Sequence, residues 1–224
     1  MAIALYSVAS GGSQSGLAYT NTFASAPVEG NVQIAWVTRR DGTASVFTWT
    51  GAGWTLIRRS STTAGDSWPC AMYYRPVTAG LSDTDTVTGS VAGGNIHWVG
   101  AEFSGLGALD TDNGSGPATG QPNFSFTPTS GLEALLIAGV SVRNDSSPDL
   151  TVAGAMTELF ADFDQQSSNG PRVGMYYQLV NPTTGSYTVG ATGSTSARAV
   201  VAASFRAGVT DQIGLKGFQP VLIG

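Results

Sequence analysis

Charged side chains are scarce in this sequence of 224 residues. Asp, Glu, Lys and Arg make up only 11% of it, the formal net charge is −5, and Lys216 is the only lysine. A nucleic-acid-binding protein needs a basic surface that neutralises phosphate groups, and no segment of this chain supplies one. We therefore expect no nucleic-acid partner.

The sequence contains one cysteine, Cys70, and one histidine, His97. A single cysteine cannot form an intrachain disulfide bond. A structural zinc site needs four ligands at characteristic spacing, which one cysteine and one histidine cannot provide. A Ser-His-Asp or Cys-His catalytic device would have to be built around His97. The sequence predicts no metal ion, no cofactor and no catalytic residue.

Long hydrophobic runs are also missing, since no stretch approaches the roughly 20 apolar residues that a membrane span requires. The first residues, Met1 to Tyr6, are mostly apolar but lack a basic leader and a long apolar core. They are typical of a first β-strand rather than of an export signal. We expect no membrane partner.

Clustered oxygen ligands for calcium could come from Asp110, Asp112 and Asn113, or from Asp83 and Asp85. Calcium sites need such clusters, but Asp and Asn are also ordinary turn residues. The second explanation is simpler, and we expect no calcium site.

What the sequence does contain is an internal repeat. Met72-Tyr73-Tyr74 returns as Met175-Tyr176-Tyr177, an offset of 175 − 72 = 103 residues. Other anchors recur in the same order. Ile34–Val37 aligns with Ile137–Val140, Phe23 with Phe126, and Val99–Phe103 with Val201–Phe205. Hydrophobic positions that recur in order predict a duplicated domain, with residues 1–107 as the first copy and 108–208 as the second.

Each copy consists of short segments with β-strand character, separated by glycine-rich turns. Many short strands at a regular spacing of about 8–12 residues are typical of antiparallel β-sandwiches. We therefore expect an all-β fold of two tandem antiparallel β-sandwich repeats, and the pattern leaves jelly-roll and immunoglobulin-like topologies open. The expected strands are 3–9, 17–23, 32–39, 45–50, 54–60, 70–77, 86–91 and 96–104 in the first copy, and 123–127, 134–142, 150–152, 156–161, 173–180, 186–191 and 198–205 in the second.

Three local signals refine this prediction. Val32–Arg39 is apolar on both faces, which is typical of a central strand that is covered twice. Asp41-Gly42 is a strong hairpin signal and predicts that Ser45–Thr50 returns beside that strand. The glycine-rich segment 105–122 is interpreted as the junction between the two copies.

All five tryptophans lie in the first copy. Trp36 and Trp98 are on predicted central strands and are assigned to the core. Trp49, Trp54 and Trp68 flank turns, where indole rings can stack on sugars or anchor a protein interface. The alternative is that these three rings simply cap the end of the first sandwich.

Two residues of the first copy could act as a general acid or base, but their equivalents in the second copy could not. His97 corresponds to Ala199 and Glu102 to Ser204. The same fold therefore tolerates residues without acid–base chemistry at both positions. Glycan cleavage also needs a second carboxylate that faces the first, and no partner for Glu102 stands out. We expect a protein that is not an enzyme.

Residues 209–224 have no counterpart in the first copy. An ordinary frayed terminus is one interpretation. Its density of large apolar side chains favours the other, an extended arm that docks on a partner. The apolar residues of this arm are Ile213, Leu215, Phe218, Val221, Leu222 and Ile223.

Several segments together resemble a known family. They are the opening Met1–Leu5 with its following Ser/Gly stretch, Gly53-Trp54-Thr55-Leu56, Met72-Tyr73-Tyr74-Arg75, and Glu102-Phe103-Ser104-Gly105-Leu106. This pattern resembles small duplicated β-sandwich proteins of tailed-bacteriophage virions and covers about residues 1–208. The matching positions are core and turn residues, so no functional residue is carried over.

The resemblance implies a non-enzymatic structural protein of a bacteriophage virion. Capsid decoration and a tail appendage are both compatible with it. Such a protein would act through contacts with other virion proteins, as a homo-oligomer located in the virion. The alternative function is a carbohydrate-binding or receptor-binding module for host glycans, which the first-copy tryptophans would serve.

Overall fold

The computed structural model describes the chain in thirteen stretches. They are residues 2–9, 14–15, 18–39, 47–59, 69–89, 95–118, 123–128, 133–143, 151–152, 155–163, 171–181, 185–192 and 198–208. Everything that follows concerns these residues. Trp68, the Asp41-Gly42 turn and the predicted arm 209–224, with all six of its apolar residues, lie outside them.

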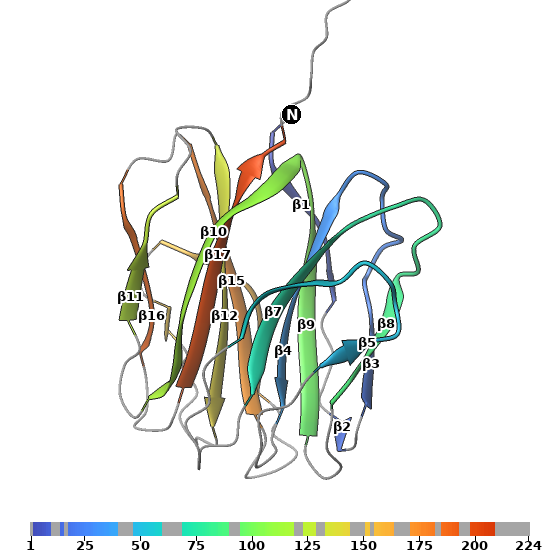
Figure 1. The fold of residues 1–224 in the computed structure, drawn as a ribbon, viewed down its shortest axis with the longest axis horizontal. Helices are drawn as coiled ribbons and strands as arrows, with labels where there is room; N and C mark the ends of the chain where they lie inside the picture. Colours follow the sequence, from blue (N-terminus) through green and yellow to red (C-terminus); the bar gives the residue numbers. More distant parts are fainter. Residues whose placement is uncertain are drawn as a thin grey trace, which may run out of the picture.

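The described residues form antiparallel β-sheets, as predicted (Figure 1). In the first half, a large sheet has the order β1-β9-β4-β7-β6 and a small sheet the order β3-β8-β5. The large sheet consists of β1 (Ala4–Ala9), β9 (Asn95–Ser104), β4 (Val32–Arg39), β7 (Cys70–Pro76) and β6 (Thr55–Arg59), and β2 (Gln14–Ser15) also pairs with β9. The small sheet consists of β3 (Ala18–Thr22), β8 (Thr84–Thr88) and β5 (Thr48–Trp49). We call β1 to β9 the first lobe.

The second half, here the second lobe, repeats this arrangement, except that its described residues include no counterpart of β2. Its large sheet has the order β10-β17-β12-β15-β14 and its small sheet the order β11-β16-β13. The large sheet consists of β10 (Leu106–Ala118), β17 (Arg198–Ala207), β12 (Ala134–Arg143), β15 (Pro171–Val180) and β14 (Thr157–Phe163). The small sheet consists of β11 (Asn123–Phe126), β16 (Tyr187–Thr192) and β13 (Thr151–Val152).

The agreement between the lobes extends to irregularities of the edge strands. The register of β6 against β7 shifts between Leu56 and Arg58, and that of β14 against β15 shifts between Glu158 and Phe160. Both shifts leave one extra residue on the edge strand, as in a β-bulge. One predicted equivalence is off by two residues: Phe126 pairs with Tyr187 as Asn21 pairs with Asp85, so Phe126 stands where Asn21 does rather than Phe23.

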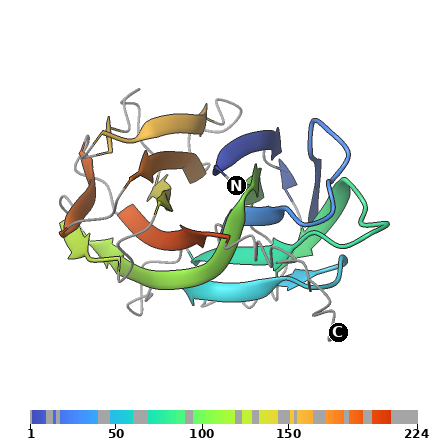
Figure 2. The same ribbon diagram turned by 90° about the horizontal axis from the view of Figure 1, so that it is seen from above.

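The two large sheets pack against each other in the middle of the molecule, and the two small sheets cover their outer faces (Figures 1 and 2). One apolar core therefore contains residues of both lobes, including Ile34 and Met72 from the first and Ile137 and Met175 from the second. All eight residues of β4 are buried, which confirms the prediction of a strand covered on both sides. Each lobe also has a core of its own between its large and its small sheet, so the large sheets are apolar on both faces.

Contacts across this central core are reciprocal. Tyr74 of the first lobe meets Phe205 of the second with ring centroids 5.6 Å apart, and Phe103 meets Tyr177 at the same distance. β6 lies along β10, so the strand order of one sheet runs opposite to that of its neighbour (Figure 2). Reciprocity of this kind is the property of a two-fold interface.

Trp36 breaks the reciprocity at one point. Its indole ring is fully buried and lies on Gly139, the residue in the corresponding position of the second lobe. A Cβ atom at Gly139 would lie 2.3 Å from Cδ2 of Trp36. The indole Nε1 donates hydrogen bonds to the Val140 carbonyl at 3.2 Å and to the Ser141 hydroxyl at 3.0 Å. The Trp36 ring thus occupies the space that a side chain at position 139 of the second lobe would need.

Two local predictions were wrong. Ser45–Thr50 does not return beside Val32–Arg39, because β4 lies between β7 and β9, and β5 pairs with β8 in the small sheet. The glycine-rich segment from residue 105 is not a loop up to residue 118 but the long edge strand β10. The prediction of a loop relied on the glycines of this segment, because glycine is depleted in strands in general. The chain passes between lobes at Gly105, whose φ of 71° suits glycine.

The described residues include no helix that is both long enough and apolar enough to cross a bilayer.

Candidate functional site

Two of the three candidate tryptophans, Trp49 and Trp54, form a stacked pair at the outer side of the first lobe. Their ring centroids are 4.4 Å apart with an interplanar angle of 22°. Trp49 also meets Trp98 and Tyr73 edge-on, at 5.3 and 5.6 Å. Both rings are half-buried and pack against the core between the large and the small sheet. The two rings therefore pack on the core of the first lobe as well as on each other.

Arg75 covers Trp54 and ties it to a buried ion pair. Its guanidinium carbon lies 4.3 Å from the centroid of the Trp54 ring, and its Nη1 lies 2.8 Å from Oδ2 of Asp85. Both charged side chains are 1% exposed. Burial lowers the pKa of the Arg75 guanidinium below its ordinary value, and Asp85, followed by Glu102, opposes that shift.

The Asp85 carboxylate accepts further hydrogen bonds in addition to its ion pair with Arg75. Oδ2 also accepts from Nε1 of Trp54 at 2.7 Å, and Oδ1 accepts from the Thr50 hydroxyl at 2.9 Å. The backbone N–H groups of Gly51 and Thr86 donate to Oδ1 at 2.8 Å each. These donors bring together β7, β8 and the turn after β5. Asp85 is therefore a structural anchor between the two sheets of the first lobe.

Glu102, the acid in an unusual position, is fully buried on β9. Its Oε1 accepts from the Asn31 amide at 2.7 Å and from the Val28 backbone N–H at 3.0 Å, and its Oε2 accepts from the Gln33 amide at 2.8 Å. Gln33 in turn accepts from Nε of Arg75 at 2.8 Å. The carboxylate has no solvent exposure, and both of its oxygens accept hydrogen bonds from groups of its own lobe. Its hydrogen bonds with Val28 and Asn31 hold the 28–31 turn against the sheet.

These contacts join into one chain of buried polar groups, which we call the polar network: Asn31, Glu102, Gln33, Arg75, Asp85 and Trp54. Sequence reasoning singled out Glu102, Trp54 and, as a possible calcium ligand, Asp85. The signal for the others was present, because Gln33, Arg75 and Glu102 are polar residues on one face of strands that are otherwise apolar. Their strand register makes them neighbours: Gln33 is paired with Arg75 on one side and Glu102 on the other.

The remaining candidates are occupied by separate contacts. His97 is fully buried, with its ring edge-on to Tyr19 at 5.8 Å. Asp110 accepts from Arg206 and Asp112 from Arg58, and Asp112 with Arg58 bridges the two lobes. Within the described ranges, no group of three or more His, Cys, Asp or Glu side chains comes together as metal ligands would.

Tyr176, in the outer core of the second lobe, gives a measurable pH dependence. Burial, with a smaller contribution from the charge of Glu158, raises the pKa of Tyr176 to about 12. The unfolded value is about 10. The neutral form therefore contributes stability that is complete below pH 10 and is lost as the pH rises through about 12. We expect the free energy of unfolding to fall over this range, and the fall to be shallower in Tyr176→Phe. Chemical denaturation at each pH measures the free energy of unfolding. If this free energy falls equally steeply with pH in the unmodified protein and in Tyr176→Phe, the prediction is contradicted.

Comparison of the chain with protein-family models, with curated proteins and with solved structures found no match.

Proposed function

We propose that this protein is a non-enzymatic structural component of a tailed-bacteriophage virion, which acts through protein–protein contacts. The class of assembly rests on the resemblance of the sequence to duplicated virion β-sandwich proteins. The non-enzymatic part rests on one observation above all. Glu102, the strongest catalytic candidate, is buried and saturated by donors of its own lobe. Capsid decoration and a tail appendage are both compatible with this proposal.

The tandem organisation of the fold belongs to the same proposal. Matching strand order, matching register shifts and reciprocal aromatic contacts support two copies of one ancestral sandwich. In both lobes the first strand of the large sheet pairs with the last, as β1 does with β9 and β10 with β17. This connectivity favours the jelly-roll over the immunoglobulin alternative, in which the first two strands are neighbours. A body of four stacked sheets with an apolar core between each neighbouring pair is suited to a particle surface.

Glycan binding through the first-lobe tryptophans has less support. Sugar recognition needs an accessible indole face. Trp54 is stacked on Trp49 on one side and approached by the Arg75 guanidinium. Its Nε1, the polar group that would contact a sugar hydroxyl, donates to Asp85. These rings are used to close the first lobe.

The predicted arm provides the test of the virion proposal. Deleting residues 209–224 should leave both lobes folded but abolish oligomerisation or attachment to the particle, because the apolar side chains of Phe218 and its neighbours would be the docking groups. Burying Phe218 with two or three aliphatic residues contributes roughly 5–8 kcal/mol before ordering costs, at about 1.5–3 kcal/mol for each side chain. Ordering the segment cancels much of this gain, so several symmetry-related arms would be needed for tight attachment.

Light scattering coupled to size-exclusion chromatography measures the oligomeric mass, and a particle-binding assay measures attachment. A variant with Phe218→Ser and Leu222→Ser keeps the full length and serves as the matched control. It should show the same loss as the deletion. Unchanged mass and unchanged particle occupancy in both proteins would refute a docking role for the arm.

A further inference from the structure

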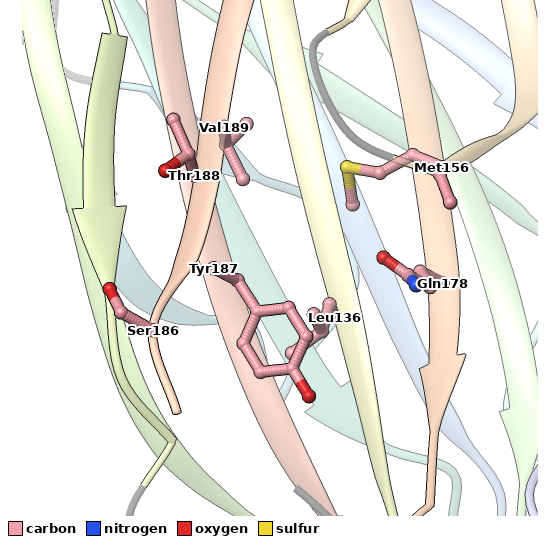
Figure 3. Close-up of a pocket in the computed structure, with 8 residues that line it drawn as sticks. Leu136, Met156, Gln178, Ser186, Tyr187, Thr188 and Val189 are labelled. Atoms are coloured by element: carbon pink, nitrogen blue, oxygen red, sulfur yellow. The ribbon is translucent and has the colours of Figure 1, made fainter. Parts of the chain in front are cut away.

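The second lobe contains a cleft between its large and its small sheet. It has a volume of about 300 Å³ and is partly open to solvent (Figure 3). Leu136 and Val189 form its buried wall, and Met156, Gln178 and Tyr187 are the half-buried side chains that surround it. We call this space the outer cleft. Its size is at the lower end of the range for small-molecule sites in proteins.

Strand register identifies what the first lobe has at the same place. Leu136 is paired with Gln178 and Ser204, as Gln33 is with Arg75 and Glu102. Tyr187 is paired with Phe126 on its neighbouring strand, as Asp85 is with Asn21. Met156 precedes Thr157, which is paired with Tyr177, as Trp54 precedes Thr55, which is paired with Tyr74. The outer cleft thus replaces the polar network.

At the Trp54 position the replacement exchanges an indole ring for a thioether, while at the Asp85 position it introduces the ring of Tyr187. In the first lobe the indole of Trp54 donates its Nε1–H to a carboxylate. In the second lobe Met156 is smaller, and no charged residue takes the places of Arg75 and Asp85. An apolar cavity of about 150 Å³ can bind benzene, so the outer cleft is large enough for two fused rings.

The chemistry of the walls matches such a ring. Leu136 and Val189 offer apolar surface, and the Met156 thioether is a favourable neighbour for an aromatic ring. Gln178 can accept or donate a hydrogen bond and Tyr187 carries a hydroxyl group. In the described part of the chain neither polar side chain makes a hydrogen bond to the protein. Both are therefore available to fix the edge of a ligand that carries one N–H or O–H group.

We propose that the outer cleft binds a planar aromatic group of indole size with one hydrogen-bond donor, in the position that Trp54 fills in the first lobe. This site is independent of the virion proposal, since it lies in the second lobe and uses none of the arm residues. The donor group of the ligand faces Gln178 or Tyr187. The ring packs between Leu136, Val189 and Met156.

Methionine methyl groups report directly on this site. The chain has four methionines, of which Met156 lines the outer cleft while Met72 and Met175 are fully buried in the central core. With ¹³C-methyl methionine labelling of the full chain, indole should shift the Met156 resonance and leave those of Met72 and Met175 in place. We expect a Kd on the order of 1 mM or tighter, from the affinity that ligands of this size reach. No shift of Met156 up to the solubility limit of indole, or equal shifts of all three residues, would overturn the proposal.

Substitutions locate the ring and its polar edge. Met156→Trp restores the first-lobe residue, should fill the outer cleft, and should abolish indole binding measured by saturation-transfer NMR. Leu179→Trp is the matched control: it adds the same ring at the neighbouring, exposed position and should leave binding unchanged. Unperturbed Met72 and Met175 resonances verify that each variant is folded. Binding that persists in Met156→Trp would place the ligand elsewhere and refute the proposal.

The hydrogen bond is tested with a second pair. Gln178→Leu should weaken indole binding roughly five- to tenfold but leave 1-methylindole, which has no N–H donor, unaffected. Equal loss for both compounds would contradict a polar role for Gln178. N-acetyltryptophanamide distinguishes the source of the ring. If it binds as well as indole, the group is a tryptophan side chain of a partner protein. If only indole binds, the group belongs to a free small molecule.

Discussion

Replacing Trp36 by glycine should lower the free energy of unfolding by about 3–5 kcal/mol, the range for removing a fully buried indole ring. The ring has no solvent exposure, packs on Gly139 of the other lobe, and donates to Val140 and Ser141. Its removal leaves a cavity in the centre of the shared core and two acceptors without their donor. Chemical denaturation of the full chain measures the loss.

The same position offers a test of the two-fold relation between the lobes. Gly139→Trp alone should also destabilise the protein, because its Cβ would already overlap with Trp36. The double variant Trp36→Gly with Gly139→Trp moves the ring to the equivalent position. There the corresponding acceptors are the Val37 carbonyl and the Thr38 hydroxyl. We expect the double variant to be more stable than either single variant. A double variant no better than the worse single one would show that the two sheets are not equivalent at this point.

Removing Asp85 is expected to have an effect of similar size. Asp85→Ala should cost about 3–5 kcal/mol, because it leaves the Arg75 guanidinium buried without its counter-charge. The Trp54 indole and the 50–51 turn would lose their acceptor in the same step. Thermal and chemical denaturation should both report this loss.

A more exposed ion pair of the same chain provides the control. Asp112 pairs with Arg58, and their side chains are 25% and 40% exposed. Asp112→Ala should therefore cost less than about 1 kcal/mol. The residues of the second lobe suggest a rescue: Asp85→Tyr with Arg75→Gln reproduces Tyr187 and Gln178, which the same fold accommodates without charge. This pair should be more stable than Asp85→Ala. If Asp85→Ala and Asp112→Ala have equal effects, the buried pair is not an anchor.

The candidate site could be predicted only in part. Glu102 and the tryptophans stood out because acids within strands and clusters of indoles are unusual in a sequence. Their function was decided by partners that no pattern connects: Asn31 and Arg75 are distant from Glu102 and Trp54 in the chain. The outer cleft was not predictable at all. A cavity is the difference between the volume that strands enclose and the volume that side chains fill, and small differences such as Met156 for Trp54 determine it.

By itself the sequence determined the all-β class, most strand positions and the recurrence of Met72-Tyr73-Tyr74 as Met175-Tyr176-Tyr177. These features depend on local alternation and on order along the chain, which a single sequence records. Tertiary structure alone decided that the two large sheets share one core, that β5 joins the small sheet, and that β10 is a strand in spite of its glycines. Each of these depends on which apolar faces meet in space. Burial on both faces of β4 is compatible with many partners, and only the packed chain shows that one of them is the other lobe.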